Sequence, residues 1–277
     1  MKLISWNLNS RSNNVILRDQ VNYLLSQNLD VITLQEVTKS SLGYFLDAFK
    51  HLNQISSFEL SEDTDELKGK RKYGEMIISK FKFKYLDANR IGLPFPERVL
   101  SVVFEDKGIE LLTTHIPPGS SNGVIKVKHF EALYDYLAKK SPHSRIVTGD
   151  FNSPKAETTN GEIVTWGQKI NNKGEIRLAI NSKWKDQCTP ERWDSAERKI
   201  IDMQNTLDMK DAFRDLHSYK KNGYSWKSTR KDIDIRRRYD HVFCSNSLKV
   251  NSCDYDHTPR EQGLSDHAPI ICEIECG

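Results

Sequence analysis

The sequence predicts a layered α/β domain, and three observations support this fold class. The first 50 residues alternate apolar strand-like runs with segments of helical periodicity. Short strand-like runs then recur as far as the C-terminal end of the chain. The 277 residues are 37% hydrophobic and 29% charged, a globular composition that excludes disordered and fibrous proteins. Because no repeat, low-complexity tract or proline-rich linker divides the chain, we expect residues 1–277 to form a single domain.

The first half of the chain opens with strands at residues 2–6 and 30–35, both apolar runs. Apolar residues at helical spacing predict one helix after each strand. The first helix carries Leu17, Val21, Leu24 and Leu25, and the second carries Leu42, Phe45, Leu46 and Phe49. Residues 59–72 hold five acidic and four basic residues, which predicts an exposed loop or a solvated hairpin tip.

The second half begins with three strands at 73–80, 99–105 and 109–115, and a turn at 106–108 makes the last two a hairpin. Apolar spacing predicts a helix over 127–137. A buried strand at 145–149 ends at a glycine turn, and about sixty ambiguous residues follow. The remaining expected elements are a helix at 200–216 and strands at 239–245 and 268–274.

Charge, cysteines and hydropathy limit the classes of protein further. The net charge of +3 lacks the strong basic excess of a dedicated nucleic-acid-binding protein. The five cysteines are odd in number and have no CxxC spacing, so we expect reduced thiols. No apolar run approaches the roughly 18 residues of a membrane helix, and the start turns polar too early for a signal peptide. We therefore expect an intracellular, cytoplasmic protein with no membrane partner.

Polar residues stand at or beside the ends of the predicted strands. They are Asn7, Glu36, His115, Asp150, Asn152, Asp240, Asp266 and His267. In layered α/β folds the strand ends build the binding crevice, so these side chains are candidates for one shared site. Each also has an ordinary structural interpretation, since Asn7 suits a turn, Glu36 suits a helix start, and the segments around Asp150 and Asp266 suit turns or caps.

The order of these motifs is more informative than any one of them. The chain contains Ser5-Trp6-Asn7, Leu34-Gln35-Glu36, Thr113-Thr114-His115, Gly149-Asp150-Phe151-Asn152, Tyr239-Asp240-His241 and Ser265-Asp266-His267. This series resembles the exonuclease-endonuclease-phosphatase superfamily over residues 5–267. The resemblance implies a four-layer α/β/β/α sandwich of two mostly antiparallel sheets flanked by helices. It also implies a divalent-metal phosphoesterase site at one rim.

By this resemblance the metal belongs to Glu36, helped by Asn7 and Asp266. Oxygen ligands of this kind suit Mg²⁺, with Mn²⁺ as a substitute, and the cysteine and histidine cluster that zinc needs is absent from the sequence. The other roles fall to residues of the remaining motifs. Asp150 activates water, Asn152 positions the phosphate and the water, and His267 donates to a phosphate oxygen while Asp240 holds its ring.

His115 narrows the branch of the superfamily. Abasic-site endonucleases usually carry tyrosine here, whereas the deoxyribonuclease-I-like, deadenylase, sphingomyelinase and tyrosyl-DNA-phosphodiesterase-like branches typically carry histidine. His115 is then a group that stabilises the phosphate or protonates the leaving oxygen, or it is a structural residue. The stretch 207–217, followed by Tyr224-Ser225-Trp226, instead looks like the exonuclease III type. Both branches therefore stay open, as do endonuclease and exonuclease action.

A basic run from Lys227 to Arg238 suggests the substrate. It holds six basic and two acidic residues directly before Tyr239-Asp240, where cations would contact a polyanionic strand and Trp226 and Tyr224 would stack on bases. The expected substrate-binding residues are Arg11, Lys39, Trp226, Arg236, Arg237 and Arg238.

This interpretation makes the protein a Mg²⁺-dependent nuclease, acting on DNA more readily than on RNA. The basic run has a second interpretation as a solvated loop. The protein has two alternative functions: a phosphatase or phosphodiesterase for small, nucleotide or lipid phosphates, or a non-catalytic binding module.

Overall fold

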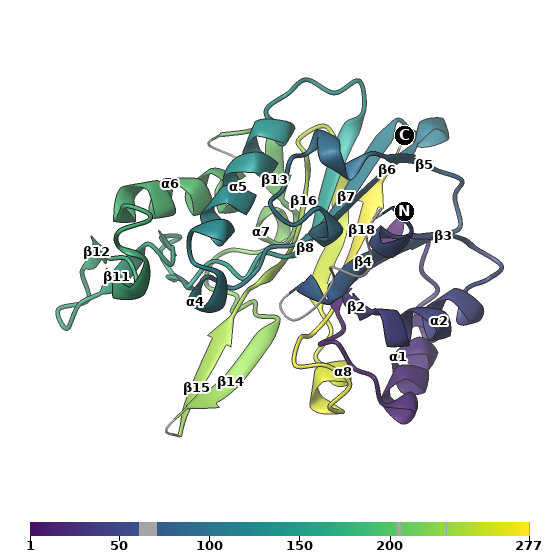
Figure 1. The fold of residues 1–277 in the computed structure, drawn as a ribbon, viewed down its shortest axis with the longest axis horizontal. Helices are drawn as coiled ribbons and strands as arrows, with labels where there is room; N and C mark the ends of the chain where they lie inside the picture. The colour runs from purple at the N-terminus through teal and green to yellow at the C-terminus, as the bar shows by residue number, and fades with distance from the viewer. Residues whose placement is uncertain (61–70, 204–205, 231, 277) are drawn as a thin grey trace.

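A computed structural model describes residues 1–60, 71–203, 206–230 and 232–276. Two six-stranded sheets form the centre, and Figure 1 shows helices on the outer side of each. The first sheet has the order β17–β18–β1–β2–β4–β3. Its strands span, in that order, Lys249–Tyr255, Ile270–Glu275, Lys2–Asn7, Val31–Thr38, Tyr73–Ser79 and Asn53–Ser56.

The second sheet has the order β13–β16–β8–β7–β6–β5. Its strands span Met209–Asp211, Asp240–Ser245, Ser144–Asp150, Ile109–His115, Val99–Phe104 and Lys84–Leu86. Neighbouring strands are antiparallel except for β1 with β2 and β7 with β8, which are parallel. The predicted four-layer sandwich of two mostly antiparallel sheets is therefore confirmed.

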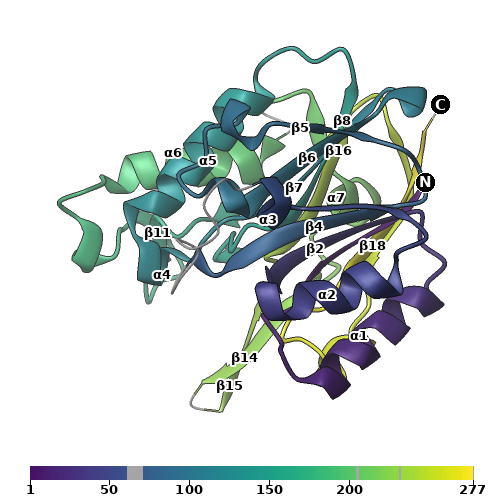
Figure 2. The same ribbon diagram turned by 45° about the vertical axis from the view of Figure 1, so that its right-hand side comes forward.

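The helices cover the outer faces of the sheets. Figure 2 shows α1 and α2 side by side against the first sheet, and α5 and α6 lie together on the side of the second sheet. The α-helices are α1 Asn14–Ser26, α2 Lys39–Ala48, α3 Ser57–Leu60, α4 Gly119–Asn122, α5 Val124–Leu137, α6 Pro190–Ile201, α7 Ala212–Leu216 and α8 Thr258–Glu261. Short 3₁₀ helices are η3 Ala88–Arg90, η4 Pro96–Arg98, η5 Glu105–Lys107 and η6 Ser182–Trp184.

Three small hairpins lie outside the two main sheets. They pair β9 Ala156–Glu157 with β10 Ile163–Val164, β11 Gln168–Ile170 with β12 Ile176–Leu178, and β14 Trp226–Arg230 with β15 Ile233–Arg237. The β14–β15 hairpin projects away from the body of the molecule (Figure 1).

The local sequence explains why α1 and α2 begin where they do. Asn13 caps α1, because its side chain accepts hydrogen bonds from the backbone N–H groups of Val15 and Ile16. Thr38 and Ser41 form a capping box at the start of α2. Each helix buries its apolar stripe on the outer face of the first sheet, as the spacing of leucine and phenylalanine predicts.

The core between the sheets is mostly apolar but contains a polar seam. Leu3, Val31, Ile146 and Val242 are among the residues packed between the two sheets. Within this layer, Nε2 of Gln35 donates to Oγ1 of Thr113 at 2.8 Å. Oγ1 of Thr148 likewise donates to Oγ1 of Thr33 at 3.0 Å. These two hydrogen bonds join β2 of one sheet to β7 and β8 of the other.

Most predicted elements are present, and three predictions need correction. The helix expected at 200–216 is instead the end of α6, the short strand β13 and α7. The alternative interpretation of the basic run as a solvated loop is replaced, since its residues 227–230 and 233–237 belong to the strands β14 and β15. Cys253 and Cys272 lie opposite each other on β17 and β18 and form a disulfide, whereas Cys188, Cys244 and Cys276 are free. Residues 61–70 of the expected charged loop lie outside the described residues.

Among residues 1–60, 71–203, 206–230 and 232–276, no helix has the length and apolar character needed to cross a bilayer.

Candidate active site

The topology brings the predicted strand-end residues to one rim. In the parallel pair β7–β8, His115 is the register partner of Asp150. In the antiparallel pair β16–β8, Asp240 is opposite the same Asp150. A cavity of about 390 Å³ opens there, and six of the eight predicted catalytic and metal residues line it, namely Glu36, His115, Asp150, Asn152, Asp266 and His267.

Asp150 lies at the centre of this rim and is 1% exposed. Its Oδ2 accepts from Nδ2 of Asn7 at 2.9 Å, and its Oδ1 accepts from the backbone N–H of Asn152 at 2.8 Å. Burial, together with the charge of Asp240, raises the pKa of Asp150 to about 7. A carboxylate with a pKa near neutrality is well suited to accept a proton from water.

His267 and Asp240 form a hydrogen-bonded pair beside Asp150. Nδ1 of His267 lies 2.6 Å from Oδ2 of Asp240, and its Nε2 lies 3.9 Å from Oδ2 of Asp150. Burial alone would lower the pKa of His267, but the charges of Asp240 and Asp150 raise it to about 10. The ring is therefore a cation near neutral pH. Its second nitrogen, Nε2, lies on the side of the ring that faces the cavity.

Glu36 reaches the cavity because β2 is irregular at this residue. The register of β2 with β4 shifts between Leu34 and Val37, and Glu36 has a φ of 55°, in the left-handed region. A bulge of this kind redirects a side chain out of the strand alternation. Burial raises the pKa of Glu36, and the nearby charge of Asp266 adds to the rise. The charge of Asp266 acts on Glu36, and two carboxylates this close to each other favour a bound cation beside them.

Asn7 orients the carboxylates around it. Its Nδ2 donates to Oε1 of Glu36 at 3.2 Å as well as to Asp150. Its Oδ1 accepts from the backbone N–H of Asn9 at 2.8 Å. A metal-ligand role for the Asn7 oxygen, as expected from the resemblance, would require the amide to turn over.

One group of three residues could also hold a metal ion within the described part of the chain. One ligand atom each from Asp150, Asp240 and His267 lies within 4.8 Å of the others, and all three residues are buried. Within this group, Nδ1 of His267 and Oδ2 of Asp240 are already hydrogen-bonded to each other.

His115 contacts a residue that the sequence did not suggest. Its Nδ1 lies 2.5 Å from Nη1 of Arg98, and both residues are buried. Burial lowers the pKa of His115 well below its usual value, and the charge of Arg98 lowers it further. Because an arginine only donates, we assign the hydrogen of the neutral ring to Nε2, which faces Glu36 at 3.8 Å and Asp150 at 3.7 Å.

Glu75 is a second buried charge that the sequence did not suggest. It is fully buried in β4, and burial raises its pKa well above the usual value while the charge of Arg98 opposes that rise. Glu75 and Arg98 lie within or beside apolar strands. In such a segment, a single sequence does not show whether a charged side chain is buried or exposed to solvent.

Lys126 supports the loop that carries Asn152. Its ammonium is 1% exposed and donates to the backbone carbonyl of Asn152 at 2.7 Å and to Oγ of Ser153 at 3.1 Å. Glu197 balances this charge at 3.2 Å. Nε1 of Trp166 donates to the same carbonyl of Asn152 at 2.9 Å. The position of Asn152 is therefore fixed by the side chains of Lys126 and Trp166.

The predicted substrate-binding residues divide into four groups, the last of which is Arg238 alone. Trp226 lines the cavity, and its Nε1 donates to Oδ2 of Asp266 at 3.2 Å. Arg236 is exposed and Arg237 is half-buried on β15. Arg11 is half-buried after β1 and Lys39 is exposed at the start of α2, and neither lines the cavity.

Arg238 corrects the prediction for the basic run. Its side chain is 2% exposed, and it contacts Glu157 at 2.5 Å and Asp211 at 2.7 Å. These two carboxylates are themselves less than 10% exposed, so Arg238 is a buried structural ion and does not face a substrate. In sequence it looks equivalent to its two neighbours, but it stands after the end of β15 and turns into the body.

The fold and the site together define a class of protein. It is a four-layer α/β sandwich with a cavity at one rim that is lined by acidic residues and histidines. The chain belongs to the Endonuclease/Exonuclease/phosphatase family, whose model matches residues 4–267. No curated protein matches the chain.

Solved structures show the same fold over the whole chain. The 3' phosphatase NExo from Neisseria, bound to a product DNA hairpin, is 21% identical with a TM-score of 0.67, and the match covers 99% of each chain. An AP endonuclease from Archaeoglobus fulgidus is 19% identical with a TM-score of 0.67, also over 99% of each chain. D. rerio TDP2, complexed with a single-strand DNA product, is 14% identical with a TM-score of 0.66, over 99% of this chain and 98% of that one.

Proposed function

We propose that this protein is a Mg²⁺-dependent phosphodiesterase that hydrolyses nucleic acid, with DNA as the preferred substrate. The observation that carries the proposal is the placement of Asp150 beside the His267–Asp240 pair in one cavity. A proton acceptor and a fixed cation at the same rim are what water attack on a phosphodiester anion requires. We also propose that residues 1–277 form a single catalytic domain and that the protein is cytoplasmic.

The donor atoms of the rim fit a hard divalent cation. Glu36 and Asp266 offer carboxylate oxygens in the lining of the cavity, and Mg²⁺ prefers such ligands, with Mn²⁺ able to replace it. We assign the cation to these two residues because both carboxylates line the cavity, whereas Asp240 does not line it and is hydrogen-bonded to His267. When bound, Mg²⁺ supplies Lewis-acid stabilisation of the charge on the phosphate oxygens.

The protein's own groups then have distinct tasks. Asp150 accepts a proton from the attacking water, and the side-chain amide of Asn152 orients the phosphate and that water. The imidazolium of His267 donates to a non-bridging phosphate oxygen, where negative charge builds in the transition state. Nε2–H of His115, held in this tautomer by Arg98, stabilises the phosphate from the other side.

Two observations support a nucleic-acid substrate. Arg236 and Arg237 stand on the projecting hairpin whose first residue, Trp226, forms a wall of the cavity. Cations and an aromatic ring beside a phosphoesterase site suit a polyanionic strand of bases. The structures of NExo and TDP2 named above contain DNA products, which supports DNA before RNA.

A small phosphate ester is the second candidate. The cavity is also lined by Trp166, Trp193 and the α4 residues Gly119 and Ser120. Walls of this kind would enclose one nucleoside or another small leaving group.

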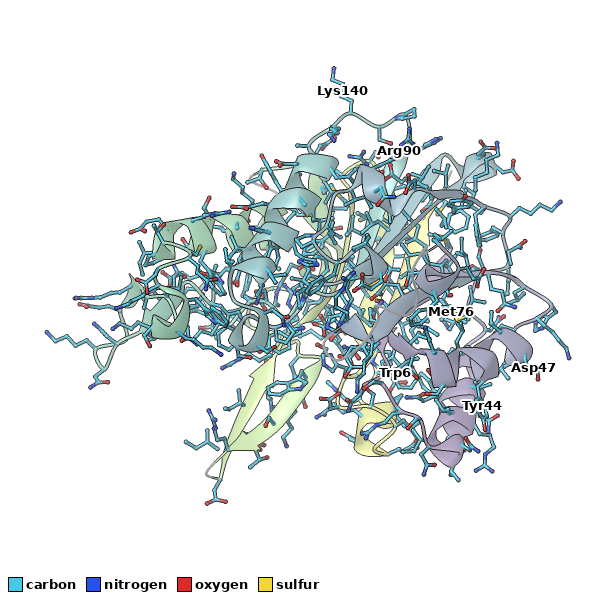
Figure 3. All side chains as sticks on the ribbon, in the orientation of Figure 1. Trp6, Tyr44, Asp47, Met76, Arg90 and Lys140 are labelled. Atoms are coloured by element: carbon cyan, nitrogen blue, oxygen red, sulfur yellow. A yellow bond between two sulfur atoms is a disulfide. The ribbon has the colours of Figure 1, made fainter. Side chains whose placement is uncertain are left out.

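The test is Mg²⁺-dependent hydrolysis over supercoiled plasmid, linear duplex, single-stranded DNA, abasic duplex, RNA and a panel of small and lipid phosphates. We compare wild type with Asp150→Asn and with Asp47→Asn, a control on the exposed surface of α2 (Figure 3). Cleavage of nucleic acid that chelator and Asp150→Asn abolish, but Asp47→Asn preserves, supports the proposal. Activity confined to small phosphates would replace it with the second candidate, and the product ends separate endonuclease from exonuclease action.

A further inference from the structure

Tyr224 is surrounded by cationic side chains just outside the cavity. The guanidinium carbon of Arg236 lies 4.9 Å from the centre of its ring, and that of Arg260 lies 5.1 Å from it. The ring of His257 stacks on Tyr224 at 4.4 Å. We call Tyr224, Arg236, His257 and Arg260 the Tyr224 cluster. It joins the hairpin to α8, two elements that lie next to each other at the same end of the molecule (Figure 1).

The cluster adjoins the proposed active site. Tyr224 precedes the cavity residue Trp226 by two positions, a span of at most about 7 Å along the chain. On the other side, Arg260 belongs to α8, and the short segment after α8 carries Asp266 and His267 to the rim. Trp226 and Asp266 are hydrogen-bonded to each other, so the two segments that carry the cluster meet at the wall of the cavity.

The positive charge of the cluster is poorly balanced. Within the part of the chain that the structure describes, no carboxylate oxygen lies within 4.0 Å of the guanidinium of Arg260, which donates to the Tyr224 hydroxyl at 3.4 Å. The nearest carboxylate to Arg236 is that of Asp234, at 4.0 Å. By contrast, Arg214 and Arg238 on the neighbouring surface share Glu157 at 2.6 and 2.5 Å.

Two acids, Asp256 and Glu261, lie close enough for their charges to act on His257, and neither forms an ion pair with Arg236 or Arg260 among the described residues. Asp256 accepts from the Tyr23 hydroxyl at 2.8 Å and from the backbone N–H of Thr258 at 2.9 Å. Burial and the charges of Arg260 and Arg236 lower the pKa of His257, so the histidine is neutral near pH 7 and packs as a ring. Two permanent guanidinium charges, held in place by one aromatic ring, are thus left to face an outside anion.

We propose that the Tyr224 cluster binds a backbone phosphate of the nucleic-acid strand, beyond the scissile phosphate and on the outer side of Trp226. This inference rests on the proposed nuclease function and makes it specific, because it requires a substrate that extends past the cavity. Arginines recognise phosphate with paired hydrogen bonds, and stacking on Tyr224 reduces the side-chain entropy that binding would otherwise cost. A mononucleotide ester bound in the cavity would not reach the cluster.

The test compares Arg260→Ala and Arg236→Ala with Arg90→Ala, an exposed arginine at the opposite end of the molecule (Figure 3). The substrates are a 12-nucleotide single-stranded DNA and bis(4-nitrophenyl) phosphate, a small diester. For each cluster variant we expect kcat/KM on the oligonucleotide, relative to that on the small diester, to fall about tenfold. The salt dependence of DNA binding should also flatten by about 0.7 in log–log slope for each lost phosphate contact. Arg90→Ala should change neither quantity.

Tyr224→Phe and Tyr224→Ala separate the ring from the hydroxyl. If the ring positions the arginines, the phenylalanine variant keeps the oligonucleotide preference and the alanine variant loses it. Ratios and salt slopes equal to those of Arg90→Ala, in an enzyme that cleaves DNA, would overturn the cluster proposal and leave the nuclease function standing. A wild-type protein that hydrolyses the small diester but neither binds nor cleaves nucleic acid would overturn both.

Discussion

His267 and Asp240 stand 2.6 Å apart between Nδ1 and Oδ2, and both are buried at the rim shared by the two sheets. Asp240 comes from β16 of the second sheet, whereas His267 precedes β18 of the first. The hydrogen bond thus links the two sheets at the point where the proposed chemistry occurs. It also fixes the ring orientation and keeps the imidazole charged.

Asp240→Asn should lower kcat by about 10²-fold or more, because the neutral amide no longer stabilises the charged form of His267. Steady-state kinetics on the best substrate of the panel measures this. Asp47→Asn, a solvent-exposed acid, is the matched control. Turnover of Asp240→Asn close to that of wild type would remove this pair from the mechanism.

Removing the divalent cation should abolish hydrolysis, and adding Mg²⁺ back should restore it. In Glu36→Gln and Asp266→Asn, the Mg²⁺ concentration for half-maximal activity should rise about tenfold or more, since each variant loses one charged oxygen ligand. Titration of activity against Mg²⁺ measures the change. An unaltered half-maximal concentration in both variants would place the cation elsewhere, with the Asp150, Asp240 and His267 group as the remaining position.

Arg238→Ala should destabilise the fold by about 3–5 kcal/mol, because it removes the buried cation that Asp211 and Glu157 share and leaves Glu157 with Arg214 alone. Arg236→Ala, on the exposed face of β15, should change stability by no more than about 0.5 kcal/mol. Urea unfolding followed by circular dichroism gives both numbers. Equal stabilities of the two variants would mean that Arg238 is not the structural ion described above.

The same ion network predicts a pH dependence of stability. Burial favours the neutral form of Asp211, but the charge of Arg238 holds its pKa well below the usual range. Its contribution is therefore complete above the unfolded-state pKa of about 3.9 and is lost as the pH falls toward the lower folded-state value. The difference in free energy of unfolding between wild type and Asp211→Asn should be largest at pH 6–7 and shrink below about pH 4. A difference that stays constant down to pH 3 would contradict this assignment.

Gly149→Ala should destabilise the fold and reduce activity together. A Cβ at this position would lie 1.8 Å from the backbone carbonyl oxygen of Thr114, and the φ of 135° is unfavourable for alanine. β7 and β8 would have to separate beside Asp150. Gly43→Ala is the control, since Gly43 is in α2 with no atom within 4 Å of an added Cβ, and it should be neutral or slightly stabilising. Thermal unfolding of the two variants tests the contrast.

The sequence predicts much of the site because of where its polar residues stand. Asn7, His115 and Asp150 each end an apolar run, and strands of a layered fold end at a common edge, so their convergence follows from local patterns. Glu36 is different, since its φ and the bulge of β2 depend on pairing with β4. Its place could be inferred only from the family motif.

Several contacts between residues that are distant in the chain could not be predicted. Arg98 and Lys126 look like surface charges in sequence, yet His115 and Glu197 make them buried members of the site. The disulfide of Cys253 with Cys272 depends on β17 and β18 becoming neighbours, which cysteine spacing alone does not reveal. The pairing of β14 with β15 was hidden by the dense charge of the segment, which resembles that of a solvated loop.

The polar seam between the sheets has a consequence for how the enzyme becomes active during folding. Apolar side chains tolerate small sliding of one layer over the other, whereas the bonds of Gln35 to Thr113 and of Thr148 to Thr33 form in one alignment only. Asn7 and Glu36 come from one layer, and Asp150 from the other. A collapsed state with misaligned layers would bury unpaired amide and hydroxyl groups and would also lack a complete set of reacting groups. The seam therefore makes the correctly aligned sandwich the favoured state and the only one in which hydrolysis can occur.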